Sequence, residues 1–236
     1  MKRLFAFGCS YTAYMWSTWA DIIGTEFSEY QNWAQTGAGN FYMFASIMEA
    51  HQRCKFTADD TVIVCWTNVT RDDRYVNGWR TLGNVFTQTL IDQKWVRENI
   101  TERGCIIRDL ACIAATTHFL RSIGADWKYI SMVPLLQTDQ YDTKQLPEFE
   151  VQDVIDCYRD IINLIGPSYQ EILKDRKMLS WDMHPSPQDH LDYVDRVLPE
   201  YRISSQTRLQ IAEEERKVRS MTASQKNYTD YKITRL

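Results

Sequence analysis

A serine stands shortly after an apolar run near the N-terminus, in the stretch FAFGCSYT. The run at residues 4–7 is unbroken and ends at Gly8, which is typical of a strand in a parallel sheet covered on both faces. Ligands of such sheets bind outside the carboxyl ends of the strands, so the hydroxyl of Ser10 is a candidate nucleophile. The alternative is that Ser10 or Thr12 caps the helix that follows.

Three later segments also carry polar or glycine residues at or just past an expected strand: NWAQTGAGN, VIVCWTNVTR and MLSWDMHPSPQDH. A serine hydroxyl is a weak nucleophile until an imidazole takes its proton, and the oxyanion formed on attack needs hydrogen-bond donors. The backbone N–H groups of Ser10 and Gly37 and the amide of Asn68 are suitable donors. His184 is a suitable base, and Asp182 lies two residues before it.

Taken in order, these four segments resemble the sequence blocks of the SGNH (GDSL-like) hydrolase superfamily, over about residues 3 to 200. The resemblance implies that Ser10 is the nucleophile and that Gly37 and Asn68 complete an oxyanion hole. It also implies that His184 is the base and that Asp182 orients it.

The function implied by the resemblance is that of a serine esterase without a cofactor or a metal. Its substrate would be a small acyl ester, such as an O-acetyl ester of a carbohydrate, cleaved through an acyl-enzyme. An acyltransferase that uses the same site is one alternative. A non-catalytic binding or assembly protein that retains the fold is the other.

The segments differ from the family pattern at three places. Cys9 stands where the family has Asp. Its thiol is the alternative nucleophile, but we expect it on the side of the chain opposite to Ser10. Asn68 lacks the Gly and Asp that usually accompany it, which leaves a surface or strand-capping asparagine as the alternative. Asp182 precedes His184 by two residues rather than three. The alternative partner of the imidazole is therefore a backbone carbonyl, and Asp182 would then cap the next helix. If Asp182 is the partner, Asp182→Asn is expected to lower kcat severely.

Three other histidines compete with His184 for the role of base. His190 lies inside an expected helix, where a structural role is favoured. His51 and His118 also lie in expected helices, far from any strand end, and we interpret them as ordinary helix residues.

Two arginines follow Asn68 closely. Arg71 and Arg74 are suited to clamp a carboxylate or phosphate of the substrate. Asp72 and Asp73 lie between them and favour surface ion pairs instead. Aromatic residues around the expected site would suit stacking on sugar faces or filling the core, namely Tyr11, Tyr14, Trp16, Trp19, Trp66 and Trp79.

The composition, 44% hydrophobic and 25% charged over 236 residues, is ordinary for a globular protein. Apolar runs fall short of the roughly 18 residues of a membrane span, and no cleavage site follows the N-terminal run, so we expect a cytoplasmic protein with no membrane partner. The six cysteines form no C-x-x-C pair and no zinc-like pattern, so free thiols are expected.

The charge is distributed unevenly along the chain. The net charge is −4, yet residues 202–236 carry eight Lys and Arg against four Asp and Glu. The acidic remainder of the chain is poorly suited to nucleic acid. The expected partner is a small-molecule or carbohydrate ester substrate. We predict one domain at residues 1–200 and a basic helical tail at 201–236, solvated or bound to a partner.

Strand-like and helix-like segments alternate along the chain, which predicts an α/β fold. The expected architecture is a three-layer αβα sandwich around a flavodoxin-like parallel sheet of about five strands in the order 2-1-3-4-5. A long insertion at about residues 69–102, after the third strand, should carry short helices and overhang the strand ends as part of a lid. The expected strands are 4–7, 30–34, 61–66, 128–133 and 177–181, and the expected helices are 41–53, 106–123, 151–165 and 204–221.

Overall fold

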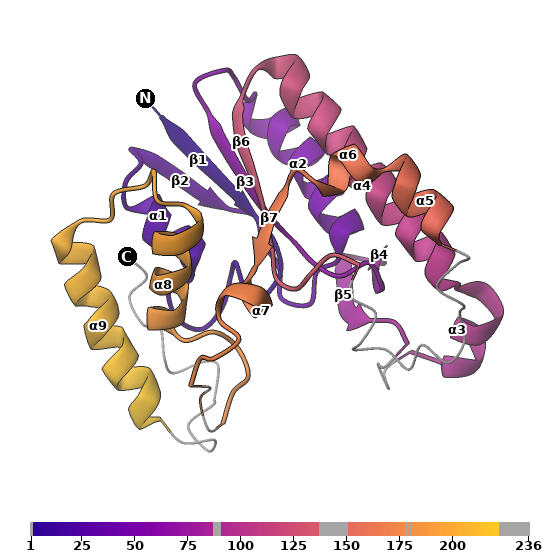
Figure 1. Ribbon diagram of the computed structural model, residues 1–236. Helices are drawn as coiled ribbons and strands as arrows, with labels where there is room; N and C mark the ends of the chain where they lie inside the picture. Colours follow the sequence, from indigo (N-terminus) through magenta and orange to yellow (C-terminus); the bar gives the residue numbers. More distant parts are fainter. Residues whose placement is uncertain (1, 87–90, 137–150, 178, 180, 222–236) are drawn as a thin grey trace.

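A five-stranded parallel sheet forms the centre of the molecule in the computed structural model, which describes residues 2–86, 91–136, 151–177, 179 and 181–221. The strand order is β2-β1-β3-β6-β7, so the first strand lies beside both the second and the third (Figure 1). The predicted α/β class, parallel sheet and strand order are confirmed. The strands are β1 (Arg3–Phe7), β2 (Glu29–Asn32), β3 (Thr61–Trp66), β6 (Asp126–Ser131) and β7 (Ile165–Ser168).

Helices cover both faces of this sheet, which explains why every residue of the central strand β3 is buried. Helices α1, α8 and α9 lie on one side, and α2, α4, α5 and α6 lie on the other (Figure 1). Because both faces of these strands are covered, their side chains must be apolar on both sides and do not alternate with polar ones. The bounds are α1 (Trp19–Gly24), α2 (Asn40–Cys54), α4 (Glu102–Ile123), α5 (Gln152–Cys157), α6 (Arg159–Ile162), α7 (Tyr169–Ile172), α8 (Pro187–Val197) and α9 (Ser205–Ser220).

The prediction of the fifth strand at residues 177–181 is wrong. The edge strand is β7, whose Ile165 pairs with Tyr129 of β6. The expected helix at 151–165 is likewise interrupted: it divides into α5 and α6, and the chain enters β7 at Ile165. Gly166 and Pro167 disfavour a helix there, whereas an edge strand tolerates a proline. The described residues of 177–181 form no strand, and Leu179 packs in a small cluster with Tyr14 and Trp16.

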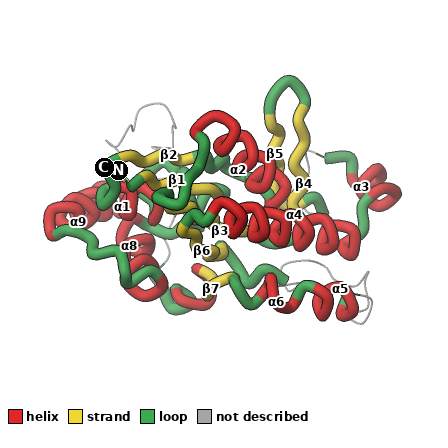
Figure 2. Tube along the Cα trace, turned by 90° about the horizontal axis from the view of Figure 1, so that it is seen from above, coloured by secondary structure: helices red, strands yellow, loops and turns green. Residues whose placement is uncertain are grey.

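The insertion after β3 contains an antiparallel hairpin, which the sequence did not indicate. Its strands are β4 (Arg71–Tyr75) and β5 (Trp79–Asn84), and Figure 2 shows the hairpin reaching away from the sheet beside α2. The reversal uses Asn77 and Gly78, which both have positive φ angles. One short helix, α3 (Gln93–Asn99), follows the hairpin.

The C-terminal helix α9 packs along α8. It buries Thr207, Ile211, Glu214 and Val218, which recur at helical spacing. The expectation of a solvated helix is therefore wrong for this face. The buried stripe is partly polar, so hydrophobicity alone does not reveal it in the sequence. The carboxylate of Glu214 accepts a hydrogen bond of 2.9 Å from the backbone N–H of Ser17. The boundary at residue 200 stays a prediction.

Within the described part of the chain, no helix combines the length and apolar character that crossing a membrane would need.

Candidate active site

Ser10 lies on a tight turn directly after β1. The backbone N–H groups of Thr12 and Ala13 both donate to the carbonyl of Cys9, at 2.9 and 3.1 Å. Gly8 is needed here, because a Cβ atom would lie 2.0 Å from the Thr12 hydroxyl oxygen. Ser10 and Thr12 cap no helix, since α1 begins after Thr18.

Cys9 lies in the core and does not line the cavity that Ser10 lines. Its thiol is fully buried and lies 3.6 Å from the sulfur of Met132. Ser10, by contrast, lines a cavity. That the two side chains face opposite sides of the chain stays a prediction.

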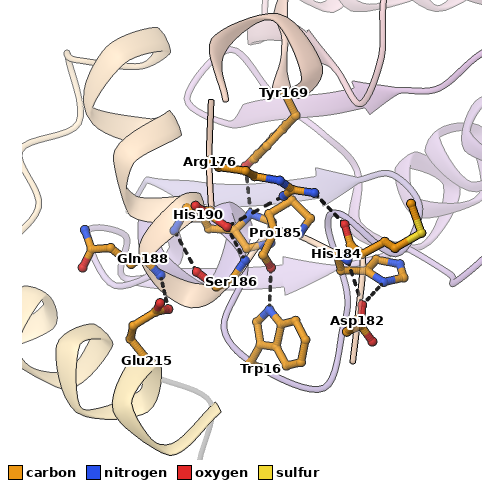
Figure 3. Close-up of polar contacts among 12 residues, drawn as sticks. Trp16, Tyr169, Arg176, Asp182, His184, Pro185, Ser186, Gln188, His190 and Glu215 are labelled. Atoms are coloured by element: carbon orange, nitrogen blue, oxygen red, sulfur yellow. Dashed lines mark hydrogen bonds and ion pairs between the residues drawn. The ribbon is translucent and has the colours of Figure 1, made fainter. Parts of the chain in front are cut away.

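Ser10 Oγ lies 3.0 Å from Nε2 of His184, and Nδ1 of the same ring lies 2.7 Å from Oδ1 of Asp182. Figure 3 shows Asp182 beside the imidazole of His184. Serine, imidazole and carboxylate thus form a continuous chain of hydrogen bonds between residues 174 positions apart. This is the arrangement that a serine nucleophile needs.

Asp182 can hold the ring of His184 from only two residues away because one carboxylate oxygen accepts hydrogen bonds from two donors of His184. Oδ1 of Asp182 accepts from the backbone N–H of His184 at 2.7 Å as well as from its ring. The cap of α8 is Ser186, not Asp182, and Pro187 starts the helix. The side chain of Asp182, and not a backbone carbonyl, therefore holds the imidazole.

Tyr14 supports this pair, a role that the sequence reasoning missed. Its hydroxyl donates to Oδ2 of Asp182 at 2.6 Å, and its ring stacks on His184 with centroids 4.0 Å apart. Burial alone would raise the pKa of Asp182, but the hydrogen bonds from Tyr14 and from the backbone and ring of His184 outweigh it and hold the pKa at about 2. In the sequence, the only indication of this role is that Tyr14 lies four residues after Ser10.

The loop that carries His184 is held by two further side chains. Trp16 donates from Nε1 to the carbonyl of Pro185 at 2.8 Å, and Arg176 donates to the carbonyl of Met183 at 2.5 Å. In Figure 3 these two side chains reach the loop from below and above. The imidazole is thus fixed by contacts to both of its neighbours in the chain.

Gly37 and Asn68 line the same cavity as Ser10, because the ends of β2, β1 and β3 lie side by side. We call this the Ser10 cavity; its volume is about 410 Å³. The described lining residues are Ser10, Thr36, Gly37, Asn68, Arg71, Thr81, Leu82, Gly83, Asn84 and Met132. The hairpin contributes five of them, one from β4 and four from β5, so it overhangs the strand ends as the predicted insertion should.

Asn68 presents a free amide donor. Its Oδ1 accepts from the Thr67 hydroxyl at 3.1 Å and from Nε of Arg71 at 3.2 Å. Because Arg71 can only donate, the atom that faces it must be the amide oxygen. The Nδ2 group makes no hydrogen bond to a described residue, and it is therefore available to a ligand in the cavity.

Gly37 has a φ angle of +79°, and a Cβ atom there would lie 2.2 Å from the carbonyl oxygen of Thr81. Only glycine combines this conformation with so close an approach of the hairpin. The backbone N–H groups of Ser10 and Gly37 donate no hydrogen bond within the described part of the chain. Together with the Asn68 amide, three donors of the Ser10 cavity are thus unused.

A buried polar network fixes the loops that carry these donors. The side chain of Asn40 bridges the backbone N–H and carbonyl of Thr67, both at 2.9 Å, and donates to Asp109 at 3.0 Å. Burial raises the pKa of Asp109 to about 7 although Arg108 opposes the shift. Asp73 accepts from the N–H groups at the start of α2. Asn40 is the first residue of α2, so its side chain links the start of this helix to the end of β3.

His190 does not reach Ser10. Its Nδ1 lies 2.9 Å from the hydroxyl of Tyr169, and burial lowers its pKa well below the ordinary value. His190 is thus a core residue of α8. His51 and His118 lie in α2 and α4, as predicted.

Arg71 and Arg74 differ in their surroundings. Arg74 pairs with Asp72 at 2.5 Å and lies 4.2 Å above the ring of Trp95, so the interpretation as a surface ion pair is correct for it. Arg71 lines the Ser10 cavity. The aromatic residues Tyr14, Trp16, Trp19 and Trp66 are buried and therefore belong to the core rather than to a surface for sugars.

The described residues include no group of three or more His, Cys, Asp or Glu side chains that could hold a metal ion.

Comparisons with known proteins yield similarity at the level of structure only. A scan against protein-family models finds no match, and a search of curated proteins finds none either. A crystal structure of a member of the lipolytic protein G-D-S-L family from Veillonella parvula DSM 2008 is similar at 10% identity, with a TM-score of 0.45. The match covers 83% of this chain and 97% of that chain. The crystal structure of TesA is similar at 11% identity and a TM-score of 0.45, over 82% and 96%.

Proposed function

We propose that this chain is a serine hydrolase of the SGNH type that cleaves a small acyl ester through an acyl-enzyme. The observation that carries the proposal is the hydrogen-bonded chain from Ser10 through His184 to Asp182, at 3.0 and 2.7 Å. It opens onto a cavity in which three hydrogen-bond donors are unused. A nucleophile, a base and an oxyanion site are the minimum that acyl transfer requires.

In the first half of the reaction, Ser10 Oγ attacks the acyl carbon while Nε2 of His184 takes its proton. The carbonyl oxygen becomes an oxyanion, which accepts hydrogen bonds from the N–H groups of Ser10 and Gly37 and from the Asn68 amide. The ester bond then breaks. His184 returns the proton to the leaving alcohol, and the acyl group stays on Ser10.

In the second half, a water molecule attacks the acyl-enzyme and gives its proton to His184. Collapse of the new oxyanion releases the acid and returns the proton to Ser10. Asp182 stays ionised at neutral pH because its pKa is about 2. Its negative charge stabilises the imidazolium formed in both halves.

The test is covalent labelling with a fluorophosphonate probe, followed by mapping of the modified residue. We expect the label on Ser10, and we expect Ser10→Ala to abolish both labelling and hydrolysis of p-nitrophenyl acetate. Ser122→Ala, a change at an exposed serine of α4, is the matched control and should retain both. Cys9→Ala should also be labelled normally.

The proposal would be overturned if Ser10 were not labelled and the wild-type protein were inert toward esters. A non-catalytic binding protein would then be the better interpretation. Adding alcohols as acceptors to the same assay distinguishes hydrolysis from acyl transfer, because both share the acyl-enzyme and differ only in what resolves it.

A further inference from the structure

The Ser10 cavity carries a single kind of charge. Among its described lining residues, Arg71 is the one with a charged side chain. A neighbouring hollow of about 310 Å³ shares Leu82 with the cavity but contains Asp72 and Asp92 as well as Arg74 and Arg80. The positive charge in the Ser10 cavity therefore has no acidic counterpart on its walls.

The guanidinium of Arg71 also forms no ion pair with a carboxylate in the part of the chain that the structure describes. Nε donates to Asn68 Oδ1 at 3.2 Å, one terminal nitrogen donates to the carbonyl of Ala38 at 2.9 Å, and the other lies 3.4 Å from the sulfur of Met132. A thioether is a weak acceptor. Because a guanidinium has five N–H groups, one N–H on each terminal nitrogen is left without a described partner.

Two other arginines of this region, Arg74 and Arg108, are paired with carboxylates. Arg74 pairs with Asp72, and Arg108 pairs with Asp109 at 2.7 Å and faces Asp72 at 3.8 Å. Asp73, on the same strand as Arg71, uses its two oxygens for the N–H groups of Gly39 and Tyr42. Asp73 is close enough to interact electrostatically with Arg71 but forms no ion pair with it, so an anion bound in the cavity would compensate the charge of the half-buried guanidinium more fully.

We propose that Arg71 binds a carboxylate on the substrate, so that the substrate class is an acyl ester of a molecule that carries an acid group. This inference rests on the proposed function. The two N–H groups without a described partner belong to one planar guanidinium, which suits the two oxygens of a carboxylate. One positive charge balances a carboxylate, whereas a phosphate monoester carries nearly two negative charges at neutral pH.

A structural role is the competing explanation, because Arg71 also holds the oxygen of Asn68. Loss of that hydrogen bond would misplace an oxyanion donor and slow the hydrolysis of every ester equally. Loss of a carboxylate contact would slow only acidic substrates. The ratio of two matched substrates therefore separates the two roles.

The experiment compares 4-acetoxybenzoate with 4-acetoxybenzamide, which carry the same acetyl group and differ in charge at the para position. Each kcat/KM is divided by the rate constant of the same ester with hydroxide, to remove intrinsic reactivity. In the wild-type protein we expect the corrected kcat/KM to be about tenfold or more higher for the carboxylate. Arg71→Met should bring the ratio close to one.

Two further variants sharpen the interpretation. Arg71→Lys keeps the positive charge but not the bond from Nε to Asn68, so both substrates should slow while much of the preference remains. Arg74→Met is the matched control, because Arg74 is already paired with Asp72 and lies outside the Ser10 cavity. It should leave both rates and their ratio unchanged.

A second readout needs no turnover. The product 4-hydroxybenzoate should slow fluorophosphonate labelling of Ser10 in the wild-type protein but not in Arg71→Met, and 4-hydroxybenzamide should slow neither. Equal corrected rates for the two esters, or an equal loss for both in Arg71→Met, would overturn the inference and leave the esterase intact. A wild-type protein that hydrolyses neither ester and is not labelled at Ser10 would overturn the proposed function, and this inference with it.

Discussion

Asp182→Asn is expected to lower kcat only about five- to thirtyfold, because the position of Oδ1 receives two N–H donors. Both the backbone and Nδ1 of His184 donate to it, each at 2.7 Å. An asparagine must therefore place its carbonyl oxygen there and turn its NH₂ group toward Tyr14. The Tyr14 hydroxyl, which now donates to Oδ2 at 2.6 Å, can rotate and accept instead. The imidazole thus keeps its orientation and its tautomer.

The magnitude follows from what is lost, which is the charge of the carboxylate. A hydrogen bond to a charged group is worth about 1.5–3 kcal/mol, against about 0.5–1.5 kcal/mol for a neutral one. The difference of about 1–2 kcal/mol corresponds to about a five- to thirtyfold decrease in rate. A variant that loses the correct tautomer loses about 10⁴-fold. The sequence alone suggests that larger loss; the backbone N–H of His184 is the reason to expect the smaller one.

The assay is the steady-state hydrolysis of p-nitrophenyl acetate, with active sites counted by fluorophosphonate labelling. Asp182→Ala serves as the comparison, because it leaves both donors of His184 and the hydroxyl of Tyr14 without their acceptor and should be far more damaging. A loss near 10⁴-fold in Asp182→Asn would refute the reasoning, since it would mean that the imidazole is no longer held. A change below about twofold would show that the carboxylate charge contributes nothing.

Four other outcomes can be measured. Asn68→Ala should lower kcat about 10²–10³-fold with little change in KM, because its amide acts on the oxyanion; an effect on KM alone would assign it to substrate binding. Gly37→Ala should lower the melting temperature by about 4 °C or more, because φ is +79° and the added Cβ would lie 2.2 Å from a backbone oxygen; an unchanged value in calorimetry would contradict this. The pKa of Asp182 is about 2, so its carboxylate stays ionised as the pH falls to about 4. Above pH 4, the acid side of a plot of log kcat/KM against pH should therefore have a slope no steeper than one. Tyr14→Phe removes a donor to the carboxylate, which raises its pKa and should steepen the slope at higher pH.

Much of the site could be predicted from local patterns. Ser10 and Asn68 come directly after buried apolar strands, and Gly37 follows the next strand in the sheet. Apolar runs of this kind need cover on both faces, which implies a parallel sheet with crossover helices. The carboxyl ends of parallel strands meet at one edge. The neighbourhood of these three residues therefore follows from short segments and the order of the strands.

The identity of the edge strand could not be predicted in the same way. The runs at 165–168 and 177–181 are both short, and such runs look alike whether they pair in a sheet or pack in a cluster. What decides between them is the partner. Ile165 pairs with Tyr129 of β6, whereas Leu179 finds its apolar contacts in the cluster with Tyr14 and Trp16.

The residue types Asp182 and His184 were evident in the sequence, but their geometry and charge state were decided by tertiary contacts. Tyr14 and Trp16 reach this loop from 168 and 169 positions away in the chain. That Arg71 forms no ion pair with a carboxylate of the described residues is equally invisible in the sequence, where two aspartates follow it directly. Those aspartates bond to other groups, because hydrogen bonds and ion pairs form between groups that are close in the folded chain, whatever their spacing along it.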